Sequence, residues 1–82
     1  MTAAEIRETV LKVLVNIAPE ADLSRLAPAA RLRDQLDIDS MDFLNFIIGI
    51  HKELHVEIPE RDYSQLMTLA GCIDYLQKAA KD

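Results

Sequence analysis

The residues with the clearest chemical potential are one serine and the carboxylates around it. Ser40 lies between Asp39 and Asp42, directly before a strongly apolar run with helical spacing. A serine nucleophile of an enzyme needs a neighbouring base and an oxyanion site, and the flanking sequence offers neither. Nearby negative charge also disfavours an alkoxide. The pattern therefore predicts a hydroxyl that another protein modifies, in a chain that is not an enzyme.

Two patterns that could bind a metal have the wrong spacing. His51 and His55 stand four apart, but the zinc-protease arrangement needs Glu directly after the first His, where this chain has Lys52. A lysine there would also repel a cation. The aspartates from Asp37 onward resemble the opening of a calcium loop, yet the glycine required at position six is Asp42. The sequence therefore predicts no metal site.

The composition bounds the class of protein. The chain has 82 residues, half of them hydrophobic and 5% aromatic, which favours a compact helical bundle forming one domain over residues 1–82. A single cysteine excludes an internal disulfide and suits a reducing compartment. No apolar run is long enough to cross a bilayer, and the first residues lack the zones of a signal peptide. We expect a cytoplasmic monomer without membrane contact.

The negative charge is concentrated in one segment. The net charge is −5, and residues 37–62 hold seven acids against two bases, whereas the rest of the chain is balanced. This charge argues against nucleic acid as a partner, because phosphate binding needs a basic face. The segment has two interpretations: a docking region for proteins with basic patches, or a solvated surface that keeps a small protein soluble.

Helical spacing and turn signals divide the chain into three main helices and a short one. Thr2 and Glu5 form a capping-box pattern, and the helix that follows ends before Pro19. A long connection then spans residues 18–39. A short helix is expected over 60–65. The apolar positions of the first helix are Ile6, Val10, Val13, Leu14 and Ile17; those expected to anchor the connection are Leu23, Leu26, Leu32 and Leu36.

Thr68 is expected to cap the last helix, in which Cys72 falls on the inward apolar stripe with Leu69, Ile73 and Leu76. Cys72 is therefore predicted to be a small buried apolar residue, not a reactive thiol. No strand pattern is present. The predicted fold class is all-α.

The second main helix should begin at Asp39 or Ser40, either of which can cap it. At about 100° per residue, it carries two apolar stripes on opposite faces. One stripe is Phe43, Phe46, Ile47, Ile50 and Leu54; the other is Met41, Leu44 and Ile48. A surface helix needs only one such stripe. The second predicts an exposed docking patch, unless the connection over residues 18–39 folds across it.

Three segments together resemble the acyl carrier protein family. Residues 36–42 (Leu-Asp-Ile-Asp-Ser-Met-Asp) are similar to its Asp-Ser-Leu modification motif. Residues 53–60 end in Ile-Pro-acid and resemble its acidic segment, and residues 68–76 are similar to its last helix. The resemblance covers essentially the whole chain, in the same order and spacing. It implies a four-helix acyl-carrier-like bundle with a long first loop and a short third helix.

The resemblance also implies a function. Ser40, between Asp39 and Met41, would receive a 4′-phosphopantetheine arm from coenzyme A through a separate phosphopantetheinyl transferase. The arm's thiol would then hold acyl groups as thioesters in fatty-acid, lipid or polyketide biosynthesis. Acyl-transferring and acyl-processing enzymes with basic or apolar patches would dock at Asp37, Asp42, Leu44, Ile48, Glu53, Glu57 and Glu60. The acyl chain would be sheltered by Phe46, Ile50, Ile58, Leu66 and Cys72.

Several residues depart from the family pattern. Met41 replaces the usual leucine, and Asn45, His51 and Lys52 stand where typical fatty-acid-synthesis carriers have glutamates. These changes favour a specialised carrier whose docking depends more on apolar contacts. Two alternatives remain: an aminoacyl or peptidyl carrier, against which Asp39 counts, and an acidic helical adaptor that carries no group.

Overall fold

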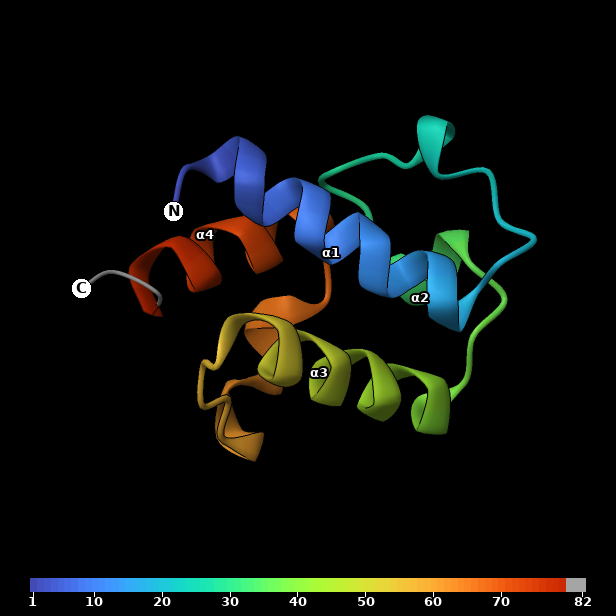
Figure 1. Ribbon diagram of the computed structural model, residues 1–82. Helices are drawn as coiled ribbons and strands as arrows, with labels where there is room; N and C mark the ends of the chain where they lie inside the picture. Colours follow the sequence, from blue (N-terminus) through green and yellow to red (C-terminus); the bar gives the residue numbers. More distant parts are fainter. Residues whose placement is uncertain (80–82) are drawn as a thin grey trace.

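Helices account for the regular structure of the chain (Figure 1). The computed structural model describes residues 1–79. Its elements are α1 (Ala3–Ile17), the 3₁₀ turn η1 (Leu23–Arg25), α2 (Leu32–Gln35), α3 (Ser40–Leu54), the 3₁₀ helix η2 (Glu60–Leu66) and α4 (Leu69–Ala79). Within that range no strand forms, and Arg31 and Thr68 make one isolated bridge. The predicted all-α fold, with three main helices, a short third one and a long first loop, is confirmed.

The first helix begins at the predicted capping box. Thr2 Oγ1 accepts a hydrogen bond from the Glu5 backbone N–H at 3.1 Å, and Glu5 Oε1 accepts one from the Thr2 backbone N–H at 2.8 Å. Hydrogen bonds from Thr2, the backbone one foremost, lower the pKa of the Glu5 carboxyl because they favour its charged form. Ala18 follows the last turn, and Pro19 prevents the helix from continuing.

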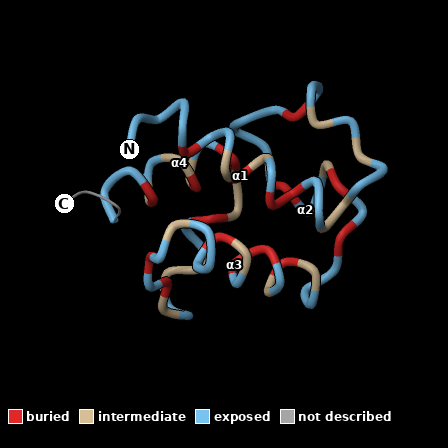
Figure 2. Tube along the Cα trace, viewed as in Figure 1, coloured by how far each residue is buried: buried red, intermediate tan, exposed pale blue. Residues whose placement is uncertain are grey.

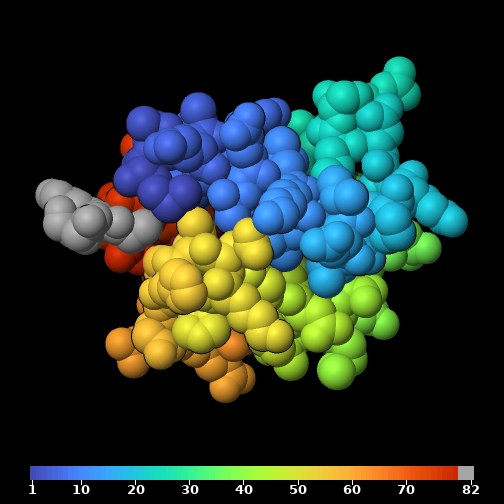
Figure 3. Space-filling model, in the orientation of Figure 1, coloured from blue at the N-terminus to red at the C-terminus, as the bar shows by residue number. Residues whose placement is uncertain are grey.

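The core forms where α1 packs against both α3 and α4, and the buried stretches of the trace gather there (Figure 2). On the surface, the blue atoms of α1 meet the green and yellow atoms of α3 (Figure 3). The buried side chains of these three helices are Ile6, Val10, Val13, Leu14, Phe43, Phe46, Ile47, Ile50, Leu69, Cys72 and Leu76. Gly49 allows α3 to approach α1 closely, since a Cβ at this position would lie 2.7 Å from Val13 Cγ1. The apolar stripes predicted for these helices therefore face one another.

The long loop over residues 18–39 attaches to the α4 side of the molecule. The Leu32 backbone N–H donates to the Met67 carbonyl at 2.8 Å, and the Ala70 backbone N–H donates to the Pro28 carbonyl at 2.9 Å. Gln35 ties the loop to itself, because its Nε2 donates to the Ala27 carbonyl at 2.9 Å. Of the four predicted anchors, Leu26, Leu32 and Leu36 are buried and Leu23 is half-buried.

η2 is joined to α4 through side-chain hydrogen bonds. The Tyr75 hydroxyl donates to Asp62 Oδ2 at 2.7 Å, and Cys72 Sγ donates to the Leu66 carbonyl at 3.3 Å. Thr68 Oγ1 accepts from the Gly71 backbone N–H at 2.9 Å and so caps α4 as expected. Burial raises the pKa of the Cys72 thiol to about 12, which agrees with its predicted place in the core.

The molecule is elongated, with principal extents of 34 × 24 × 20 Å. The N-terminus and the end of α4 lie at one end, whereas α3 begins at the other (Figure 1). In residues 1–79, no helix combines the length and the apolar character needed to span a membrane.

Candidate modification site

The first turn of α3 is built by two aspartates that cap each other. Asp39 is the N-cap, and its Oδ1 accepts a hydrogen bond from the Asp42 backbone N–H at 2.8 Å. Asp42 Oδ2 in turn accepts one from the Asp39 backbone N–H at 3.1 Å. Of the two residues that the sequence allowed as a cap, the structure selects Asp39. Ser40 becomes the first residue inside the helix.

The Ser40 hydroxyl is therefore available for chemistry. Ser40 is exposed, and the capping hydrogen bonds around it join Asp39 to Asp42 without using its side chain. His51, the first histidine after it on α3, lies eleven residues on, or roughly 16 Å along the helix axis. That imidazole is too distant to act as a base for Ser40.

An exposed apolar row begins beside Ser40. Met41 is 63% exposed and Ile48 41%, while Leu44 between them is half-buried. The alternative prediction, that the loop over residues 18–39 covers this row, is wrong because the loop bonds to residues of the η2–α4 junction instead. The second apolar stripe of α3 remains open to solvent.

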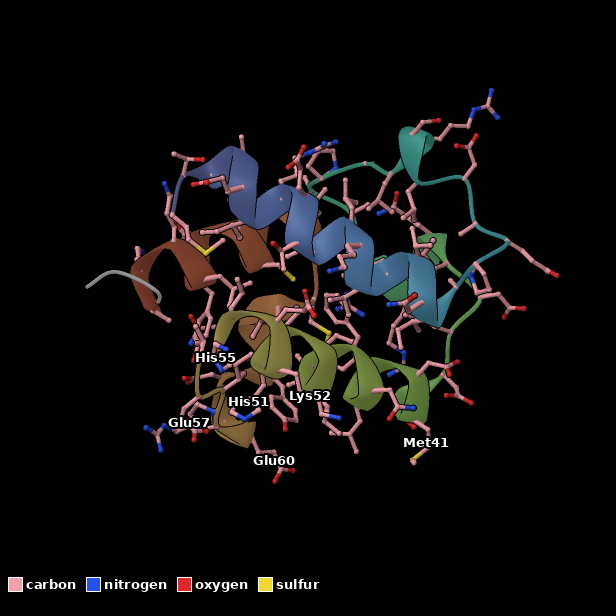
Figure 4. All side chains as sticks on the ribbon, viewed as in Figure 1. Met41, His51, Lys52, His55, Glu57 and Glu60 are labelled. Atoms are coloured by element: carbon pink, nitrogen blue, oxygen red, sulfur yellow. The ribbon has the colours of Figure 1, made fainter. Side chains whose placement is uncertain are left out.

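The predicted docking carboxylates do not form one continuous cluster. Asp37 is exposed near the start of α3, close in sequence to the Asp39–Asp42 capping pair. Glu57 and Glu60 are also exposed, but they lie beyond the other end of the helix (Figure 4). Glu53 faces α1, where its Oε1 pairs with Lys12 Nζ at 3.0 Å. The acidic segment therefore divides into two separate groups.

All five predicted acyl-pocket residues belong to the single hydrophobic core. They are Phe46, Ile50, Ile58, Leu66 and Cys72. A hollow of about 200 Å³ lies where α3 meets the segment after it, and Ile58 is the only one of the five in its lining. The other lining residues are Ile47, Ile48, His51, Glu57 and Tyr63. A larger hollow of about 560 Å³ lies between the end of α1 and the long loop.

The structure gives Tyr63 and the two histidines roles that sequence patterns did not predict. Tyr63 lines the hollow beside α3, and its ring meets Phe43 edge-on at 6.5 Å. His51 Nδ1 is 2.8 Å from the Val56 carbonyl oxygen, which ties the last turn of α3 to the following segment. His55 adopts a left-handed conformation with φ 56° and ends the helix. The only sequence signal for the role of Tyr63 is that it is an aromatic residue in η2. No local signal in the sequence indicates the left-handed conformation of His55.

The histidine pair does not assemble with further metal ligands. Throughout residues 1–79, no group of three or more His, Cys, Asp or Glu side chains is placed to hold an ion. His51 instead bonds to a backbone carbonyl.

Comparison with known proteins agrees with this geometry. A family model described as "Phosphopantetheine attachment site" matches residues 4–76. An acyl carrier protein of Chlorobium luteolum is 32% identical over 78 residues, which cover 95% of this chain and 99% of that relative. One from Chlorobium phaeobacteroides is 31% identical with the same coverage. The chain therefore belongs to the phosphopantetheine attachment family. These relatives also place the chain in the acyl carrier protein family, whose members are carriers and not catalysts and bear 4′-phosphopantetheine as their prosthetic group.

The start of α3 fits this prosthetic group. An exposed hydroxyl outside the capping network can be esterified without disturbing the helix. The backbone N–H groups and the dipole of a helix N-terminus favour the negative charge of a phosphodiester. No described side chain bonds to the Ser40 hydroxyl and competes for it.

Proposed function

We propose that Ser40 is the attachment residue for 4′-phosphopantetheine. The observation that carries this proposal is the exposed, unbonded hydroxyl of Ser40 on a helix start that Asp39 caps. Ser40 Oγ forms a bond to the pantetheine-bearing phosphorus of coenzyme A, the bond from that phosphorus to the departing 3′,5′-ADP breaks, and a base of the transferase takes the hydroxyl proton. When bound, the arm supplies a thiol that carries acyl groups as thioesters.

The neighbours of Ser40 have separate tasks in this proposal. Asp39 and Asp42 hold the backbone of the first turn, so the hydroxyl keeps one position. Asp37 and the exposed row of Met41, Leu44 and Ile48 supply charge and apolar area for the transferase and for acyl-processing enzymes. Tethering the cargo beside a docked enzyme raises its local concentration there.

The acyl chain is proposed to enter between α3 and η2. The hollow lined by Ile47, Ile58 and Tyr63 is the shallow opening on that side. Phe46, Ile50, Leu66 and Cys72 lie in the core beyond it, so they must separate to admit a chain. We place the cargo in fatty-acid, lipid or polyketide biosynthesis and the monomeric carrier in the cytoplasm, where one thiol and no disulfide fit a reducing compartment.

Mass spectrometry tests the attachment directly. The intact protein is incubated with coenzyme A, Mg²⁺ and a broad-specificity phosphopantetheinyl transferase. The native chain should gain the mass of one phosphopantetheine, and Ser40→Ala should gain none. Ser64→Ala, which removes another exposed serine, serves as the matched control and should be loaded like the native chain. A native chain that gains no mass would instead behave as the adaptor alternative.

A further inference from the structure

The charge along α3 changes sign between the start of the helix and its last turn. The first turn carries Asp39 and Asp42, with Asp37 just before it. The last turn carries Lys52 and His51, and His55 follows at the end of the helix. Figure 4 shows Met41 near the start of α3, and His51, Lys52 and His55 toward its end, on the same side of the molecule. The apolar row lies between the two charged ends.

Lys52 is the fixed positive charge at the second end. Within residues 1–79 the ion pairs are Lys12–Glu53 and Lys78–Asp74. Lys52 therefore takes part in neither ion pair, and its neighbour Glu53 is paired with Lys12 instead. At about 100° per residue, Lys52 lies only about 20° around the helix from Met41 and about 40° from Ile48. Lys52 therefore leaves the helix beside the apolar row and also lines the hollow between α1 and α3, whereas Glu53 is turned toward α1 and pairs with Lys12.

His51 stands at the opposite border of the row. His51 and Ile48 line the same hollow, and the Val56 carbonyl at 2.8 Å from Nδ1 fixes the imidazole there. Beyond the helix, Glu57 and Glu60 are exposed (Figure 4). From the start of α3 onward, the order along the chain is acids, apolar row, Lys52, then acids again.

The two charged ends act on a partner separately. Asp42 and Lys52 are ten residues apart, which corresponds to about 15 Å along the axis. The Debye length is about 8 Å at physiological ionic strength, so each end is screened from the other. A docked protein meets a negative site and a positive site, and their charges do not cancel.

From this pattern we propose that the acyl-processing partner of this carrier has a docking surface of mixed charge. Its basic groups face Asp37–Asp42, its apolar centre covers Met41 and Ile48, and one of its carboxylates faces Lys52. This inference rests on the proposed function, because docking delivers the arm on Ser40. A uniformly basic docking patch would place a like charge opposite Lys52. This repulsion would lower the association rate and the specificity of docking.

A charge reversal measures this mismatch. The probe is a purified malonyl transferase of general fatty-acid synthesis with a basic docking patch, and the readout is kcat/KM for transfer to the phosphopantetheine-loaded carrier. Lys52→Glu should raise kcat/KM about five- to tenfold at low salt. The matched control, Lys78→Glu, makes the same charge change on α4 at an exposed pair and should alter it less than twofold. Lys52→Gln should fall between, and high salt should remove the differences.

A charge swap on the probe tests the carboxylate itself. Each basic docking residue of the malonyl transferase is replaced singly by Glu. At one position the replacement should increase transfer to the native carrier and decrease transfer to the Lys52→Glu carrier. The absence of any such position, or equal effects of Lys52→Glu and Lys78→Glu, would overturn the inference. Loading of each carrier is checked first by mass, so a failure of Ser40 attachment is seen separately from a failure of docking.

Discussion

At Ser40, the identity of the helix cap determines what modification does to the fold. A serine that caps a helix with its own hydroxyl would lose part of that bond when esterified. Here Asp39 supplies the cap, so a phosphodiester on Ser40 leaves both capping hydrogen bonds intact. The added negative charge also meets the favourable end of the helix dipole. Attachment at this residue is therefore compatible with full stability of α3.

Residue patterns predicted the start of α3 well and the end of the same helix poorly. The acids around Ser40 and the apolar run after it are local signals that any helix start shows. His55 is left-handed although it is not a glycine, because Val56 and Ile58 after it must turn back into the core. The left-handed turn at His55 is required by the packing of these two side chains in the core, and the local sequence does not show that packing. The hydrogen bond of His51 was missed for the same reason.

Cys72 should make stability fall at alkaline pH. Burial raises the pKa of its thiol from 9.0 to about 12, so above pH 9 the unfolded chain loses a proton that the folded protein retains. The free energy of unfolding should be insensitive to this thiol below pH 9. It should then decline by up to about 1.4 kcal/mol per pH unit toward pH 12. Urea unfolding between pH 7.5 and 10.5 measures the slope.

Two variants separate this thiol from the nearby phenol. Burial and Asp62 also raise the pKa of Tyr75, from 10.0 to about 12. This phenol therefore adds a further decline in the free energy of unfolding that begins above pH 10. Cys72→Ala should therefore abolish the decline between pH 9 and 10, whereas Tyr75→Phe should preserve it. An unchanged slope in Cys72→Ala would show that the thiol is not the group responsible.

Among the elements, α1, α3 and α4 could be predicted from the helical spacing of apolar residues, because each helix buries one regular apolar stripe. The long loop was harder to predict. Its buried leucines could be recognised as anchors, but Gln35, which binds the loop at the Ala27 carbonyl, carries no pattern in the sequence. The interior of the candidate acyl pocket was equally hidden, since a stripe of apolar residues looks the same whether the core is closed or hollow.

The two glycines at helix contacts should differ in their tolerance of a methyl group. A Cβ on Gly71 would lie 2.5 Å from the Gln65 carbonyl oxygen, which is backbone and cannot move away. One on Gly49 would meet a Val13 methyl at 2.7 Å, which can shift. We expect Gly71→Ala to lower the free energy of unfolding by about 1–3 kcal/mol.

The comparison with Gly49→Ala uses a compensating change. Gly49→Ala should be milder, and combining it with Val13→Ala should give a destabilisation smaller than the sum of the two single changes. Denaturant unfolding of the four proteins gives these values. Equal costs for Gly49→Ala and Gly71→Ala, or strict additivity of the pair, would contradict this account of the contacts.

For the molecule as a whole, uneven charge limits stability. The net charge of −5 arises from residues 37–62, and the part of the chain that the structure describes holds two ion pairs, both exposed. Screening by salt, or weak binding of Ca²⁺, should raise Tm by a few degrees, since about 1 kcal/mol shifts Tm by roughly 4–8 °C in a domain of this size. Thermal melts with and without millimolar CaCl₂ measure the effect.

Neutral substitutions locate the source of that response. The pair Glu57→Gln and Glu60→Gln should reduce the rise in Tm, whereas Glu8→Gln, an exposed change on α1 outside the segment, should leave it intact. A melting temperature that calcium does not change, or an equal loss in the Glu8→Gln control, would argue against clustered carboxylates as the cause.

The N-terminus and the start of α3 lie at opposite ends of the molecule, which has a practical consequence for engineering (Figure 1). An affinity tag, a fluorescent label or a second domain joined at the N-terminal end would sit at the pole remote from the serine (Figure 1). Immobilised by that pole on a resin or a sensor chip, the molecule would present its exposed Ser40 hydroxyl outward, in one orientation, to every enzyme in the flowing solution.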